Sequence, residues 1–211
     1  MITFAETDDL IRRAAPRYNA HILEFGSPEA SAVRSMLEVA GKLIPTLHGP
    51  VSTVLGELSK WSFTLPMPGD RVQIYLSESG SRDPVTKLAT AMHELCHAHQ
   101  CNKAGSDAQA AVNYLGSEEL RAKLEADAKA CNVFVRYILT GEVPSSTSAV
   151  SGLGADLYHI DGPELEFAAQ IAAVHIDTML GGECPPLDVA QTFLELVRKH
   201  YPEKIAVPSF R

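Results

Sequence analysis

The sequence predicts an α+β domain that is mostly helical and has one small β-sheet. Two observations predict this fold class. Several long segments repeat apolar residues every three or four positions, whereas only residues 71–77 alternate polar and apolar side chains in the manner of a half-buried strand. This strand precedes the most distinctive helix of the chain, so we expect the sheet to lie beside that helix.

The length and composition favour a single domain. The chain has 211 residues, 45% of them hydrophobic, which is enough to bury a core without disulfides. We expect one domain over residues 1–211 with its core at about 46–140, on which N-terminal helices (1–45) and C-terminal helices (155–211) pack. The four cysteines show no C-x-x-C spacing, so reduced thiols are expected.

The charge balance bears on partners and compartment. The formal net charge is −8 and no basic run occurs, which disfavours nucleic acid and anionic membranes as partners. The first ten residues carry three acids instead of the apolar core of a secretory signal, and no run of about 18 apolar residues is present. We therefore expect a cytoplasmic protein. The oligomeric state is left open.

Capping residues and helix breakers delimit two N-terminal helices. A first helix is expected over residues 10–25, interrupted near Pro16. Ser27 and Pro28 have the types preferred at the N-cap and at the first helical position, so they are expected to open a second helix. This helix should end before Pro45.

The C-terminal half is predicted to be helical as well. Ser117 and Gly141 are expected to cap the two ends of one long helix, and two more helices are expected at about 163–180 and 186–200. Two segments rich in Pro, Gly or Ser are expected to be loops: residues 61–70 and 145–154.

The helix after the strand carries the most informative motif. Asp83 and Pro84 are expected to open it, and it contains His93-Glu94-Leu95-Cys96-His97. Successive residues of a helix step by about 100°, so His93 and His97 lie about 40° apart on one face. The opposite face carries residues expected to pack in the core: Leu88, Met92, Leu95 and His99.

Two histidines at this spacing suit a zinc ion. Zinc is commonly bound by two neutral imidazoles and a carboxylate, which leaves a fourth position for water. Glu94 lies beside His93, where its carboxylate can accept a proton from that water. Gln100 is close in phase to His93 and is a candidate to contact a ligand. A coincidental pair of core histidines is the alternative interpretation.

The third ligand must come from another segment, and the candidates are Glu125 and Asp127. On a helical wheel Asp127 falls among apolar residues, where an acid is costly unless it is paired or coordinates a metal. Asp127 is thus predicted to be a ligand or a hydrogen-bond acceptor for a ligand histidine. Glu125 is either the ligand or a solvated acid, because its side of the wheel is polar. Asp107 is a further candidate. The polar neighbours of Glu125 are Arg121, Lys129, Asn132 and Arg136.

Two runs carry a family resemblance. His93 to His97 and the later Glu125 to Ala128 resemble the zincin metallopeptidases of the gluzincin type, especially small domains with an Ala-x-His-Glu-Leu-x-His-x-x-Gln run and a later Glu-Ala-Asp-Ala run. The resemblance covers about residues 71–140. It departs at Lys129, because gluzincins commonly place an acid or Asn four residues after the ligand Glu.

The resemblance implies a zincin-like fold and a role for each matched residue. His93, His97 and Glu125 would bind Zn²⁺, and Glu94 would act as general base. The expected activity is zinc-dependent hydrolysis of a peptide bond in a peptide or protein, in which Glu94 passes the proton of water to the leaving amine.

Two further expectations and one rival concern this activity. Tyr158 is a candidate donor to the transition state, and the strand at 71–77, if it is a sheet edge, could pair with an extended peptide. The rival interpretation is a non-enzymatic helical binding or regulatory protein with a structural or relic metal site.

Overall fold

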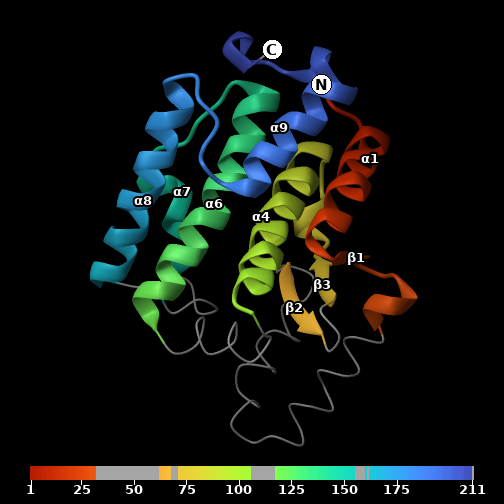
Figure 1. Cartoon of the computed structure of the whole chain (residues 1–211), viewed down its shortest axis with the longest axis horizontal. Coiled ribbons are helices and arrows are strands. Elements are labelled where there is room, and N and C mark those ends of the chain that lie inside the picture. Colours follow the sequence, from red (N-terminus) through yellow and green to blue (C-terminus); the bar gives the residue numbers. More distant parts are fainter. Residues whose placement is uncertain (32–61, 68–70, 106–116, 155–159, 161, 211) are drawn as a thin grey trace, which may run out of the picture.

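Helices dominate the architecture, and one small sheet lies beside them (Figure 1). The computed structural model describes residues 1–31, 62–67, 71–105, 117–154, 160 and 162–210. The predicted fold class, α+β and mostly helical, is confirmed. Among the described residues no helix has both the length and the apolar character needed to cross a membrane.

Six α-helices are described over their full bounds, together with five short 3₁₀ turns. Their bounds are α1 Phe4–Ala14, α4 Pro84–Lys103, α6 Glu118–Thr140, α7 Ser146–Val150, α8 Gly162–Leu180 and α9 Asp188–His200. The 3₁₀ turns are η1 Ala15–Tyr18, η3 Ser79–Ser81, η4 Ser151–Gly154, η5 Pro202–Lys204 and η6 Pro208–Phe210. Residues 28–31 are helical too, and the Ser27 hydroxyl accepts a hydrogen bond from the Ala30 amide at 3.1 Å. The rest of the predicted second helix lies outside the described residues.

The sheet has three strands in the order β1-β3-β2, and two of them fall in segments where we expected other structure. β1 is Ala20–Glu24 and lies parallel to β3, Arg71–Leu76. β2 is Phe63–Met67 and lies antiparallel to β3. The predicted helix over residues 10–25 and the predicted loop over 61–70 are therefore wrong in these parts.

Physical reasons for both corrections are visible in the backbone. Asn19 adopts a left-handed conformation with φ of 50°, which ends the helical segment and starts an extended one. Pro66 cannot donate to a sheet ladder, but β2 is an edge strand, where a proline is tolerated. The helical segment that ends at Asn19 starts with α1. This helix begins at Phe4 and not at Leu10, because Thr3 and Glu6 form a capping box.

The central position of β3 corrects another expectation. β3 has a hydrogen-bonded neighbour on both sides, so it is not an edge with free backbone groups for a peptide. The predicted loop over 145–154 is also wrong. Ser145 caps the short helix α7 by accepting from the Ser148 amide at 3.2 Å, and Val150 and Leu153 are buried.

Helix α4, which carries the histidine motif, lies at the centre of the fold. It packs against α6 on one side and α1 on the other, and it also contacts β2, β3 and α9 (Figure 1). Its predicted apolar face is buried at Leu88, Met92 and Leu95. Lys87 on α4 is buried as well, and its ammonium is held by Asp8 at 2.7 Å and Glu24 at 2.6 Å. This cation ties α1 and β1 to the motif helix.

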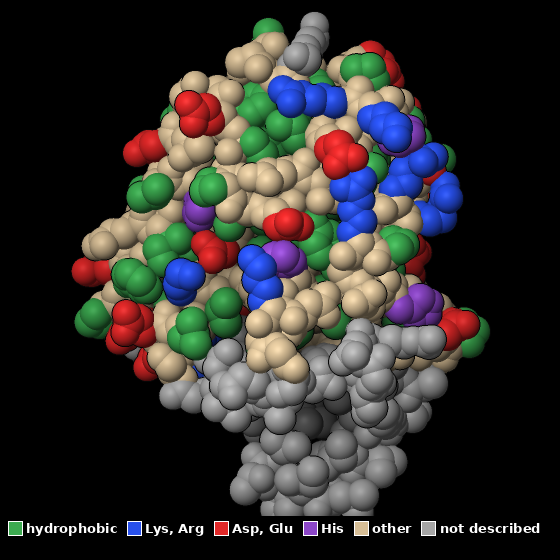
Figure 2. Space-filling model, in the orientation of Figure 1, with side chains coloured by type: hydrophobic (Ala, Val, Ile, Leu, Met, Phe, Trp, Pro, Cys, Tyr) green, Lys and Arg blue, Asp and Glu red, His purple; other side chains and the backbone are tan. Residues whose placement is uncertain are grey.

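Basic side chains gather on the surface formed by α1 and α9 (Figure 2). Arg12 and Arg13 pair with Asp9, and both guanidinium nitrogens of Arg17 contact the Glu195 carboxylate at 2.8 and 2.9 Å. These pairs reduce the positive charge that the surface presents to an anion.

Candidate metal centre

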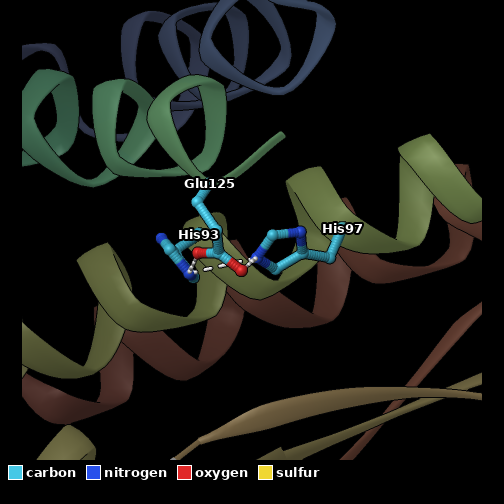
Figure 3. Close-up of side chains that lie close together, drawn as sticks. All are labelled: His93, His97 and Glu125. Atoms are coloured by element: carbon cyan, nitrogen blue, oxygen red, sulfur yellow. Dashed lines mark hydrogen bonds and ion pairs between the residues drawn. The ribbon is translucent and has the colours of Figure 1, made fainter. Parts of the chain in front are cut away.

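Three potential metal ligands converge where α4 packs against α6. His93 and His97 point from consecutive turns of α4 toward Glu125 of α6 (Figure 3). The two Nε2 atoms are 3.2 Å apart, and the Glu125 carboxylate oxygens lie 3.6 Å from Nε2 of His93 and 3.4 Å from Nε2 of His97. All three donor atoms lie within 4.8 Å of one another, and no other such group occurs in the described part of the chain.

These separations fit the donor spacing of a zinc site. Ligand atoms about 2.0–2.1 Å from a tetrahedral zinc are about 3.3–3.4 Å apart. The two Nε2 atoms are 3.2 Å apart, and each lies 3.4 or 3.6 Å from a different oxygen of the Glu125 carboxylate. Two imidazoles and a carboxylate are also a donor set that zinc commonly takes. The group can therefore hold a metal ion.

The ligand group is enclosed by protein. The exposed fractions of the side chains are 7% for His93, 13% for His97 and 1% for Glu125. Glu125 is thus buried, not solvated. Its polar neighbours on the helical wheel suggested a surface, but α4 covers this side of α6. A buried carboxylate needs a compensating positive charge, which a metal or a protonated imidazole can supply.

The electrostatics of the two histidines differ sharply. Burial lowers the pKa of His93 well below its usual value, and the nearby charges of His97 and Lys129 lower it further. Burial also opposes the charge on His97, but the Glu125 carboxylate outweighs it and raises the pKa of His97 to about 10. Without a metal, the favoured state is a neutral His93 beside a protonated His97 paired with Glu125. A metal ion would replace that proton.

Gln100 contacts one of the histidines. Its Oε1 lies 2.8 Å from Nδ1 of His97. The other ring nitrogen of His97, Nε2, therefore faces Glu125 and His93. Its Nε2 donates to the backbone carbonyl of Leu124 at 3.0 Å. The helical phase of Gln100 predicts a side chain near His93, whereas the structure brings it to His97.

Glu94 is buried beside the three ligands and faces the sheet. Only 3% of its surface is exposed, and its Oε2 accepts a hydrogen bond from the Thr64 hydroxyl of β2 at 2.8 Å. Burial raises the pKa of Glu94 to about 7, although the charge of His97 and the hydrogen bond from Thr64 act in the opposite direction. Sequence reasoning missed Thr64, because its segment was expected to be a loop.

Asp127 lies on a different face of α6 from Glu125. Its Oδ1 is 3.1 Å from Nε2 of His175 on α8, and its side chain is 18% exposed. The prediction that Asp127 is a metal ligand or an acceptor for a ligand histidine is therefore wrong, because its carboxylate pairs with a histidine outside the ligand group. Asp127 thus ties α8 to α6.

Lys129 follows Glu125 by one turn and brings positive charge to the site. It is partly buried, and its charge lowers the pKa of both His93 and Glu94. Its Nζ lies 3.9 Å from the position that a Cβ on Gly152 would occupy, so the ammonium group lies near η4. Lys129 thus adds positive charge beside the proposed ligands.

Two other candidates, Asp107 and Tyr158, lie outside the described residues.

The third histidine of α4, His99, does not join the ligand group. It packs edge-on against the ring of Tyr18, with ring centroids 5.6 Å apart.

Comparison of the chain with models of protein families, with curated proteins and with solved structures finds no match. We therefore infer function from the geometry of this site.

Proposed function

We propose that the chain is a zinc-dependent metallopeptidase that hydrolyses peptide bonds in a peptide or protein substrate. The observation that carries the proposal is the convergence of His93, His97 and Glu125 at zinc-like donor spacings. Glu94, the residue after the first ligand, is buried beside them and supplies the acid–base group that such a reaction needs. The resemblance to gluzincins at the same residues also supports it.

The proposal assigns metal binding to three side chains. His93 and His97 would donate through Nε2 and Glu125 through its carboxylate. When bound, zinc supplies Lewis acidity, which lowers the pKa of water toward neutrality and polarises a carbonyl group. Three protein ligands are typical of catalytic zinc sites, whereas structural sites usually have four.

Glu94 would move the proton. A general base works best when its pKa is near the working pH, and burial raises the pKa of Glu94 to about 7. At neutral pH the ionised carboxylate can accept a proton from water, and the resulting carboxylic acid can return it to the leaving amine. The Thr64 hydroxyl, 2.8 Å from Oε2, holds the carboxylate in place during this exchange.

The first experiment measures metal content and peptide cleavage together. Protein purified without added metal is analysed for elements, then incubated with a mixture of unstructured peptides that covers all residue types, and cleavage is followed by mass spectrometry. One equivalent of zinc and chelator-sensitive cleavage are expected. Glu94→Gln should abolish cleavage and keep the zinc, whereas Glu119→Gln, an exposed acid on α6, should change neither.

Each result separates the proposal from its rival. Zinc binding without cleavage of any peptide would favour a structural metal site in a non-enzymatic protein. Full activity in Glu94→Gln would refute the assigned mechanism. A protein that binds no zinc even after zinc is added would refute the metal site itself.

A further inference from the structure

Gln100 lies in the contact between the two helices that carry the proposed ligands. It follows His97 by three residues on α4, so both side chains lie on neighbouring parts of the same face. Each end of its amide has a different partner. Oε1 is 2.8 Å from Nδ1 of His97, and Nε2 is 3.0 Å from the carbonyl oxygen of Leu124 on α6.

These two contacts fix the orientation of the amide. A backbone carbonyl can only accept a hydrogen bond, so the NH₂ group of Gln100 must face Leu124. The amide oxygen must then face His97, and because this oxygen can only accept, Nδ1 of His97 must carry the hydrogen. Rotating the amide by 180° would place the Gln100 amide oxygen against the Leu124 carbonyl oxygen, and neither atom can donate a hydrogen bond.

The orientation has a consequence at the ligand atom. A neutral imidazole with its hydrogen on Nδ1 presents a lone pair at Nε2. Nε2 is the atom of His97 that lies 3.4 Å from Glu125 and 3.2 Å from the other histidine nitrogen. The contact with Gln100 thus selects the form of His97 that can bind a metal within the group.

The other end of the amide acts on the third ligand. Leu124 directly precedes Glu125, so the hydrogen bond from Gln100 anchors the turn of α6 that carries the carboxylate. One side chain therefore touches a ligand from α4 and the backbone beside the ligand from α6.

We propose that Gln100 is a positioning residue for the metal centre, which orients His97 through Oε1 and holds the Glu125 turn of α6 through Nε2. The proposal rests on the metal site of the proposed function and does not require peptidase activity. Partners of this kind fix the ring orientation of ligand histidines, and their loss typically weakens metal binding by about 10–100-fold.

The test compares Gln100→Met with a matched control on the same helix. Gln100→Met keeps a similar side-chain length and loses the hydrogen bonds to His97 and Leu124, together with the longer one from Nε2 to the Cys96 Sγ at 3.7 Å. Asn102→Leu removes a comparable bond, from the Asn102 amide to the Tyr18 carbonyl at 2.9 Å, which does not involve the ligands. Zinc affinity is measured by competition with a chromophoric chelator, and thermal unfolding in chelator reports the stability of each variant.

Zinc affinity should fall by about 10–100-fold in Gln100→Met and by less than about twofold in Asn102→Leu. Similar affinities in wild type and Gln100→Met would overturn the proposal, as would an equal loss in both variants. If Gln100→Met does not fold, Gln100→Asn is used, because its shorter amide cannot span both partners. The same loss of affinity is expected.

A second readout needs no metal and separates this proposal from the proposed function. In wild-type protein the His97 Nδ1–H proton should give a solvent-protected NMR signal. The signal should be lost in Gln100→Met and kept in Gln100→Glu, which retains an acceptor. A signal that persists in Gln100→Met overturns the role of Gln100, even in a protein that binds no zinc.

Discussion

The Thr64 hydroxyl on the edge strand β2 lies 2.8 Å from Oε2 of Glu94 and 3.0 Å from its backbone carbonyl oxygen on α4. The two residues are 30 positions apart, and this contact joins the sheet to the motif helix at the proposed base. It also gives the buried carboxylate a hydrogen-bond donor.

Thr64→Val should therefore destabilise the metal-free protein in a pH-dependent way. Burial raises the pKa of Glu94 from 4.5 to about 7, so the folded state holds this proton more tightly than the unfolded state. The contribution of this proton to the free energy of unfolding is fully present below about pH 4.5, and it is lost as pH rises through 7. Removing a donor to the ionised carboxylate should raise the pKa of Glu94 further and deepen this loss.

The measurement is urea unfolding in chelator at pH 5 and pH 8.5. At pH 8.5 the free energy of unfolding should fall by about 1.5–3 kcal/mol in Thr64→Val, the range for a hydrogen bond to a charged group, and by less at pH 5. Thr64→Ser keeps the hydroxyl and serves as the control. An equal loss at both pH values would show that the hydroxyl does not act on the carboxylate.

The two acids of the Glu125 to Asp127 segment should respond differently to substitution. Glu125→Gln should weaken zinc binding by at least about 100-fold, because an anionic donor is lost from the ligand group. Asp127→Asn should leave zinc binding unchanged, since Asp127 pairs with His175 instead. Chelator competition measures both affinities. If Asp127→Asn loses zinc and Glu125→Gln retains it, Asp127 is the ligand and Glu125 is not.

Lys129 is expected to weaken cation binding. Its charge lowers the pKa of His93, which means that it disfavours added positive charge at the ligands. Lys129→Met should tighten zinc binding by roughly two- to tenfold, the size expected for a partly screened charge nearby. Lys123→Met changes an exposed lysine on the same helix and should have no effect. Equal tightening in both variants would indicate a general effect of net charge.

Asp83 should stabilise the start of the motif helix. Its Oδ1 accepts from the Thr86 amide at 2.9 Å. Asp83→Ala should lower the free energy of unfolding by about 1 kcal/mol, the usual cost of losing an N-cap, and Asp83→Ser should restore most of it. Urea unfolding at pH 7 measures both. Equal losses in the two variants would contradict a capping role.

The ionisation of Asp83 adds a dependence on acid. Burial opposes ionisation, but hydrogen bonds from Thr86 outweigh it and hold the pKa of Asp83 below its usual 3.8. This contribution is present above pH 3.8 and is lost as pH falls through the lowered pKa. Asp83→Ser should therefore flatten the decline in stability below about pH 4. If the free energy of unfolding of Asp83→Ser falls just as steeply below pH 4, other carboxylates cause the fall.

Local sequence signals located helices α4, α6, α8 and α9 well, and they located α1, α7 and the edge strands poorly. Asp83, Ser117 and Gly141 cap their helices as predicted, because capping depends on a few neighbouring backbone groups. β1 and β2 escaped prediction because each is only five residues long and is stabilised by pairing with β3, a distant part of the chain. Pro66 in β2 also carries the signature of a loop.

The sequence by itself determined that His93 and His97 share one face of a capped helix, because the helical repeat fixes the angle between residues four apart. Only the tertiary structure decided which acid joins them. Both faces of α6 are covered, one by α4 and the other by α8, so a wheel of α6 alone could not tell a buried carboxylate from a solvated one. Packing turned Glu125 toward the histidines and Asp127 toward His175.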